Sequence, residues 1–341
     1  MKEEKRVIYL DYLRIIATFF VIILHISGQN IANVSINSLD FHVMNIFDSL
    51  SRFTVPMFVM ISGTLFLNPK KNFSTKKLFT KNIFRLLTAF VFWSLIYTIL
   101  SHLKHPKGII SFIFDFALGY YHLWFVYMLI GLYIITPILR KIVESKVITK
   151  YFLILSFVVN FIIPISLEIV GIQYLNSIYN NIGLNLLFGY SFYYILGYYL
   201  SIEDIKSNWR KIIYFLGIFG ALATIVLTFI ISRESNVLKT VFYDNFSITI
   251  LFQSIALYVF AKYKMNDIKI DINKITKISN CCFGIYLIHA LIINILNIFN
   301  INTLTIHPLI SIPLLSIIVY IISFILTFIL NKIPIINKYI V

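Results

Sequence analysis

Apolar runs of about 20 residues recur along the whole of this 341-residue chain, and such a run is long enough to cross the hydrocarbon core of a bilayer. Hydrophobic residues make up 59% of the chain and charged residues only 13%, which is about half the charged content of a typical soluble protein. The sequence therefore predicts an all-α, polytopic membrane helix bundle in which nearly the whole chain lies in the bilayer.

About ten transmembrane helices are predicted from these runs. Their expected ranges are 8–29, 43–67, 82–102, 119–140, 149–170, 181–201, 211–231, 246–263, 279–299 and 309–331. The first run carries Asp11, Arg14 and His25 and has no small-residue cleavage site, so we expect a retained helix rather than a cleaved signal peptide. No linker or low-complexity segment divides the chain, and one integral-membrane domain is expected over residues 1–341.

The formal net charge of +15 is distributed unevenly along the chain. Lys and Arg gather in alternate loops and near both ends, whereas the opposite loops hold only Lys104, Lys107, Arg233 and Lys239. This is the positive-inside pattern, so both termini are expected on the cytoplasmic side and the expected partner is lipid, not nucleic acid. The adjacent Cys281 and Cys282 have neither disulfide nor metal-ligand spacing, and no metal site is predicted.

Arg14 and His25 lie eleven residues apart on the first predicted helix. At about 100° per residue they return to within about 20° of one another, roughly 16 Å apart along one stripe that also holds Thr18. A cation is costly in lipid, so Arg14 either snorkels to the headgroups or pairs with Asp11, or it forms an anion site facing the bundle interior.

His25 is a candidate general base, because histidine titrates near neutral pH, although a packed histidine with a hydrogen-bonded ring is the alternative. Such a base needs an orienting carboxylate, and Asp48 is the nearest by depth, with Asp40 and Asp115 as rivals. Arg52 pairs with Asp48 at i,i+4, binds an acceptor, or stabilises a developing oxyanion.

Several other intramembrane or interfacial residues are candidates. His122 and Trp124 lie at an outer interface rich in aromatic residues, where an aromatic belt is the alternative interpretation. Tyr286 and His289 are i,i+3 neighbours, and an intramembrane histidine is rare, although it also serves as a structural hydrogen-bonding group. Gly63 is expected to permit close helix packing.

No GxxxxGK[ST], GxGxxG, HExxH or GxSxG motif is present, which argues against ATP-driven transport and serine-nucleophile hydrolysis. Attack by a substrate hydroxyl, assisted by a base, remains open. Lys81 and Arg85, near the inner end of the third predicted helix, either anchor that helix to lipid or bind an anion.

These residues belong to five blocks that resemble acyltransferase family 3 of bacterial integral-membrane proteins. The blocks are the Arg-x10-His helix YLDYLRIIATFFVIILHISG, then SRFTVPMFVMISGTLFL, KNIFRLLTAFVFWS, HLWFVYMLIGLYIITPIL and FGIYLIHALI. They occur in the family's order over nearly the whole chain. The third block departs from the family: it has only Lys81 and Arg85 where many members carry more arginines, and Thr88 where a proline is common.

The resemblance implies an acyl-CoA-dependent O-acyltransferase in the bacterial cytoplasmic membrane, of the kind that acetylates surface glycans. It implies that the donor is acyl-CoA, usually acetyl-CoA in this family, and that the acceptor is a hydroxyl of an extracytoplasmic or lipid-linked glycan. No permanently bound cofactor is expected.

The implied roles fall into three groups. His25, Asp48, Arg52 and His122 would be catalytic; Arg14, Lys81 and Arg85 would bind the donor; Trp124, Tyr286 and His289 would be substrate-binding. Two hypotheses in which the protein is not an enzyme remain open: a polysaccharide exporter or flippase, and a membrane sensor or scaffold.

Overall fold

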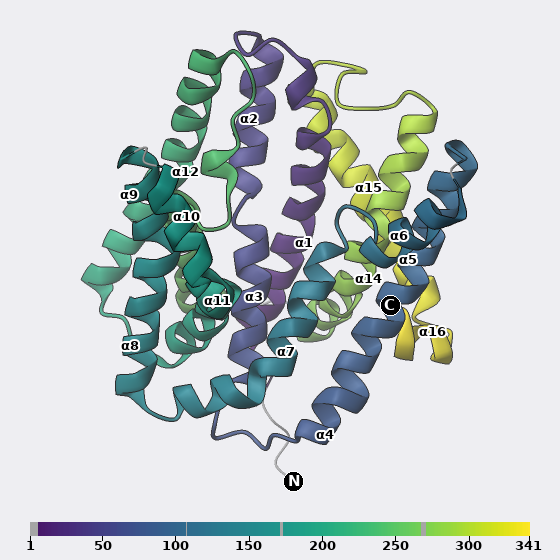
Figure 1. The fold of residues 1–341 in the computed structure, drawn as a ribbon. Coiled ribbons are helices and arrows are strands. Elements are labelled where there is room, and N and C mark those ends of the chain that lie inside the picture. The colour runs from purple at the N-terminus through teal and green to yellow at the C-terminus, as the bar shows by residue number, and fades with distance from the viewer. Residues whose placement is uncertain (1–5, 107, 171–172, 267–270) are drawn as a thin grey trace. The chain divides into compact units, whose positions relative to one another are not determined.

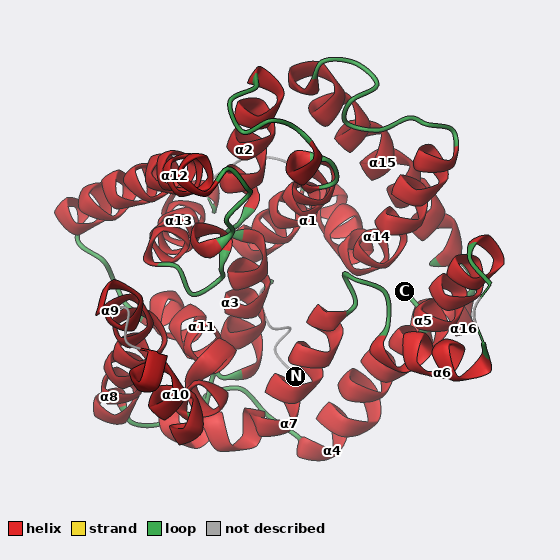
Figure 2. Ribbon diagram, turned by 45° about the horizontal axis from the view of Figure 1, so that its top comes forward, coloured by secondary structure: helices red, strands yellow, loops and turns green. Residues whose placement is uncertain are grey.

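The computed structural model describes residues 6–106, 108–170, 173–266 and 271–341 and contains only helices, turns and loops in those ranges (Figures 1 and 2). Nine of its helical segments are long and apolar enough to cross a membrane, which confirms the polytopic helical bundle. Lys107, one of the few basic residues in the opposite loops, lies outside the described residues.

The chain divides into two compact units, and α1 (Ile8–Gly28) contributes to both. The first unit comprises residues 1–17, 49–73 and 135–269, and the second comprises residues 18–48, 74–134 and 270–341. The expectation of one domain over residues 1–341 stays a prediction.

The first unit holds most of the helices from the middle of the chain. They are α3 (Thr54–Phe66), α8 (Lys146–Phe157), α9 (Ile163–Val170), α10 (Gln173–Ile182), α11 (Leu184–Ile202), α12 (Ser207–Ser235) and α13 (Ile248–Phe260). A π-helical turn, Val158–Ile162, joins α8 to α9, a second, Ala261–Met265, follows α13, and a 3-10 turn, Val241–Tyr243, precedes α13. The predicted helix 181–201 corresponds to α11, which bends at Gly189 and is not among the nine candidate spans.

The second unit holds the following helices. They are α2 (Leu39–Ser51), α4 (Thr75–Lys77), α5 (Phe84–Lys104), α6 (Ile109–Leu118), α14 (Ile272–Ile298), α15 (Pro308–Leu330) and α16 (Pro334–Tyr339). It also contains a 3-10 turn, Ile31–Asn33, and a π-helical segment, Leu78–Ile83, that leads into α5. The helix α7 (Trp124–Val143) begins in this unit and ends in the first one.

Two predicted helices differ from the structure in ways that matter for the site. The predicted helix 43–67 is broken at Arg52 and Phe53, because Pro56 has no N–H to donate to the carbonyl of Arg52 and its ring clashes there. The predicted helix 119–140 begins only at Trp124, and His122 lies in the preceding turn, which follows Gly119 at a φ of +76°.

Helices α3 and α11 pack backbone to backbone at two glycines of the first unit. A Cβ on Gly63 would lie 1.7 Å from the carbonyl oxygen of Tyr194, and one on Gly197 would lie 2.1 Å from that of Met60. Small residues let membrane helices approach this closely, where dispersion contacts hold them together. Gly63 therefore has the packing role expected from the sequence.

Gly63→Ala should destabilise the protein, because the added methyl group must push α3 away from the α11 backbone. Overpacking of this kind costs about 1–3 kcal/mol, and thermal unfolding in detergent would show it as a lower midpoint. Gly131→Ala is the matched control, since nothing lies within 4 Å of its added Cβ. Equal midpoints for the two variants would contradict the close contact.

Candidate active site

Three histidines from distant parts of the sequence converge in the second unit. His25 comes from the C-terminal part of α1, His122 from the turn before α7, and His289 from α14. The rings of His25 and His289 stack with centroids 5.2 Å apart and planes at 24°. The ring of His122 lies edge-on to His289 at 5.1 Å. The structure therefore brings together the three histidines that the sequence singled out.

Tyrosines form the wall around this histidine cluster. Tyr121 lies edge-on to His25 at 5.0 Å, and Tyr97 lies edge-on to His122 at 5.2 Å. Tyr97 also stacks on Tyr120 with centroids 4.6 Å apart. The chain has 22 tyrosines, so composition alone did not identify these three as site residues. The available signal in the sequence was that Tyr120 and Tyr121 directly precede the candidate His122.

The backbone of α14 fixes the tautomer of His289. Its Nδ1 lies 2.6 Å from the carbonyl oxygen of Tyr286, which only accepts, so Nδ1 carries the proton. Nε2 is then an acceptor, and it is buried with no hydrogen-bond partner among the described residues. The Tyr286 hydroxyl donates to the carbonyl oxygen of His122 at 2.5 Å, which ties α14 to the turn that presents His122.

The three imidazoles differ in access and in charge. His289 and His122 are 0% and 2% exposed, whereas His25 is half-buried and thus the most accessible of the three. Burial lowers the pKa of His122 well below its ordinary value, and the neighbouring His289 and His25 lower it further. His122 is therefore a neutral imidazole at neutral pH, able to donate one N–H.

The three candidate carboxylates have different surroundings. Asp48, on α2, is 1% exposed, and its Oδ2 lies 3.5 Å from the position of a Cβ on Gly28, one turn beyond His25 on α1. The two rivals have other histidine partners: Asp115 lies 2.9 Å from Nε2 of His102, and Asp40 lies 3.9 Å from Nε2 of His307. Asp48 is the carboxylate that lies beside the helix of His25.

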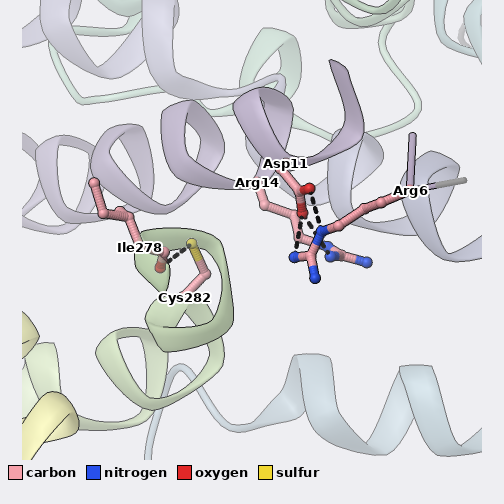
Figure 3. Close-up of polar contacts among 5 residues, drawn as sticks. All are labelled: Arg6, Asp11, Arg14, Ile278 and Cys282. Carbon is pink, nitrogen blue, oxygen red and sulfur yellow. Dashed lines mark hydrogen bonds and ion pairs between the residues drawn. The ribbon is translucent and has the colours of Figure 1, made fainter. Parts of the chain in front are cut away.

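Arg52, Arg14 and Asp11 belong to the first unit. The guanidinium of Arg52 lies over the ring of Tyr243, 4.0 Å from its centroid. The buried carboxylate of Asp11 accepts two bonds from Arg6, at 2.6 and 2.8 Å, and one from Arg14 at 3.3 Å (Figure 3). The Asp11 pairing considered for Arg14 is thus present, and two cations share one anion there.

Lys81 and Arg85 differ in their settings. Lys81 is exposed within the π-helical segment, whereas Arg85, on the first turn of α5, donates to the main-chain oxygen of Val341. Trp124 is 41% exposed at the start of α7, and Tyr286 is 8% exposed within the histidine cluster. Of the three candidate substrate-binding residues, Tyr286 and His289 lie together with ring centroids 6.0 Å apart, and Trp124 is exposed.

Metal-ligating side chains do not form a metal site in the part of the chain that is described: no group of three or more His, Cys, Asp or Glu is placed to hold an ion. The thiol of Cys282 donates within α14 to the carbonyl oxygen of Ile278 at 3.7 Å (Figure 3). What the histidine cluster offers chemically is proton transfer and N–H donation inside an aromatic wall.

Comparison with known proteins adds one match. A family model described as an acyltransferase domain, that of acyltransferase family 3, matches residues 7–331, which is nearly the whole chain. No curated protein and no solved structure matches the chain. The matched range includes all three histidines, Asp48 and Arg85.

Proposed function

This chain belongs to acyltransferase family 3, and from that membership we propose that it is a membrane O-acyltransferase with acyl-CoA as donor. The acyl group is acetyl, and the acceptor is a hydroxyl of an extracytoplasmic or lipid-linked glycan. The observation that carries the proposal is the stacked pair of His25 and His289 in the matched range, where His25 is the accessible base and His289 lies buried behind it.

His25 acts as the general base in this proposal. It takes the proton of the acceptor hydroxyl while the hydroxyl oxygen attacks the thioester carbonyl carbon. The tetrahedral intermediate collapses as its C–S bond breaks, and the proton held by His25 passes to the departing CoA sulfur. The products are the O-acyl ester and CoA, and no other reactant is consumed.

The neighbours of His25 supply orientation and charge stabilisation. Asp48 holds the imidazole and stabilises its protonated form, as expected for a buried carboxylate beside the same helix. His122, as a neutral N–H donor, and Arg52 are the candidates for stabilising the oxyanion. His289 keeps the ring of His25 in place by stacking, and Tyr286 and Trp124 contact the glycan.

The donor enters from the cytoplasmic face, which the positive-inside pattern assigns to the basic loops. Arg14, Lys81 and Arg85 bind its phosphates there, and the pantetheine arm extends between helices toward His25. The location is the bacterial cytoplasmic membrane, with the acceptor on its outer side.

Acyl transfer is tested with membranes that contain the wild-type chain, radiolabelled acetyl-CoA and membrane or cell-wall glycans. We expect label on the glycan fraction, released by mild alkali as an O-ester is, and no such label from membranes that lack the chain. Succinyl-CoA and other donors are run in parallel to identify the acyl group. No label from any donor, together with no binding of CoA by the purified protein, would leave the exporter as the better explanation.

A further inference from the structure

One cavity in the second unit is lined by basic and amide side chains. Its volume is about 440 Å³, within the range of small-molecule sites, and Arg85, Lys277 and Lys332 line it together with three asparagines. No carboxylate is among its lining residues in the described part of the chain. In the sequence, Lys277 and Lys332 stand out only as part of the positive-inside pattern.

The C-terminal segment forms part of this cavity because α5 holds it in place. The hydroxyl of Thr88 donates to the carbonyl oxygen of Tyr339 at 2.6 Å, and Nε1 of Trp93 donates to that of Ile340 at 3.1 Å. Arg85 donates to the oxygen of Val341. A proline in place of Thr88 would lack the first of these donors. In Figures 1 and 2, α16 lies beside α5 accordingly.

Amide contacts order the wall between α14 and α16. The side-chain N–H of Asn337 donates to the carbonyl oxygen of Asn331 at 3.1 Å, and that of Asn331 lies 3.6 Å from the sulfur of Cys281. On α14, Gly284 permits close approach to α15, since a Cβ there would lie 2.4 Å from a methyl group of Thr327. The lining residues of α14 and of the segment after α15 are thus fixed relative to each other.

The charge of the cavity selects its ligand. Three cations that line one cavity repel each other, and an anion between them removes that repulsion and accepts their N–H groups. Arg85, Lys277 and Lys332 each place a cationic side chain in the lining, so an anion in the cavity would lie among all three. Asparagine N–H groups add neutral donors, as phosphate sites often have.

We infer that the cavity lined by Arg85, Lys277 and Lys332 is a phosphate-binding site, and, resting on the function proposed above, that it holds the phosphates of the acyl-CoA donor. Lys277 comes from α14 and Lys332 follows α15, so the three cations of the site come from three separate segments of the second unit. A lipid headgroup presents the same phosphate chemistry, so the test separates the two sources.

The test measures binding without catalysis, using CoA that carries no acyl group. The purified protein is titrated with CoA and with 3′-dephospho-CoA, in the wild type, in Lys277→Gln/Lys332→Gln and in Lys274→Gln. Lys274 is the matched control, because it is exposed one turn earlier on the same helix and does not line the cavity. We expect the double variant to bind CoA about 10-fold or more weakly and the control to bind it as the wild type does.

Two further measurements complete the test: CoA binding by variants that keep the positive charge, and retention of lipid. Lys277→Arg/Lys332→Arg should restore CoA binding, which a merely misfolded variant would not do. In parallel, nanodiscs with and without phosphatidylglycerol are compared for lipid retained by the wild type and the double variant. Lipid retention that depends on the two lysines, with unchanged CoA affinity, would overturn the donor assignment in favour of a headgroup.

Failure of this inference and failure of the proposed function give different results. Equal CoA affinity of the wild type and the double variant, with acyl transfer intact, would overturn the cavity assignment alone. CoA binding that requires both lysines, with no transfer of label to any glycan, would support the cavity and overturn the proposed reaction.

Discussion

Replacing His25 with alanine should lower acyl transfer by about 10²–10⁴-fold, the usual contribution of a positioned general base. The loss should fall on turnover rather than on donor binding, because other side chains, Arg14, Lys81 and Arg85, are the ones proposed to hold the donor phosphates. Label transfer from acetyl-CoA at saturating donor, at matched protein levels in membranes, measures it. The physical reason is that no other accessible imidazole lies at this position: His289 and His122 are buried behind it.

His105→Ala is the control for this experiment, because His105 is an exposed histidine that caps the end of α5. It should transfer label at the wild-type rate. Normal transfer by a folded His25→Ala protein would remove the base from the mechanism and return the histidine stack to a packing role. A raised Michaelis constant for the donor with unchanged turnover would likewise contradict the role of a base.

The helices were largely predictable because the length of an apolar run is a local property of the sequence. The break at Arg52 and Phe53 was missed, although Pro56 is a local signal that predicts it. The short helix α6 (Ile109–Leu118) was missed because its ten residues are too few to span a bilayer.

The site was predictable only in part. His25, His122 and His289 were each notable as histidines within or beside apolar segments, but their meeting depends on tertiary packing that spacing does not encode. The same holds for the carboxylates. Depth in the membrane could not decide whether Asp40, Asp48 or Asp115 orients His25. Only the structure shows that two of them lie beside other histidines, Asp40 beside His307 and Asp115 beside His102. Lys277 and Lys332 were indistinguishable from other basic residues of the positive-inside pattern.

Asp48→Asn should lower acyl transfer by about 10²-fold or more, whereas Asp40→Asn and Asp115→Asn should stay within about 2-fold of the wild type. All three substitutions keep the size of the side chain and remove its charge. The different effects of the three substitutions follow from the surroundings of the carboxylates. Asp48 is buried beside the helix that carries His25, where a charge acts through a low dielectric. Asp40 and Asp115 are more exposed and lie beside His307 and His102, respectively.

The three variants are compared by label transfer per molecule of folded protein, at saturating donor. Without the Asp48 charge, this turnover should fall while CoA affinity stays at the wild-type value, since a neutral amide no longer stabilises the protonated imidazole. A structural role alone would lower the amount of folded protein and leave the turnover per folded molecule unchanged. An equal loss in all three variants would show that general negative charge, rather than a partner placed beside α1, supports the reaction, and would remove Asp48 from its proposed position.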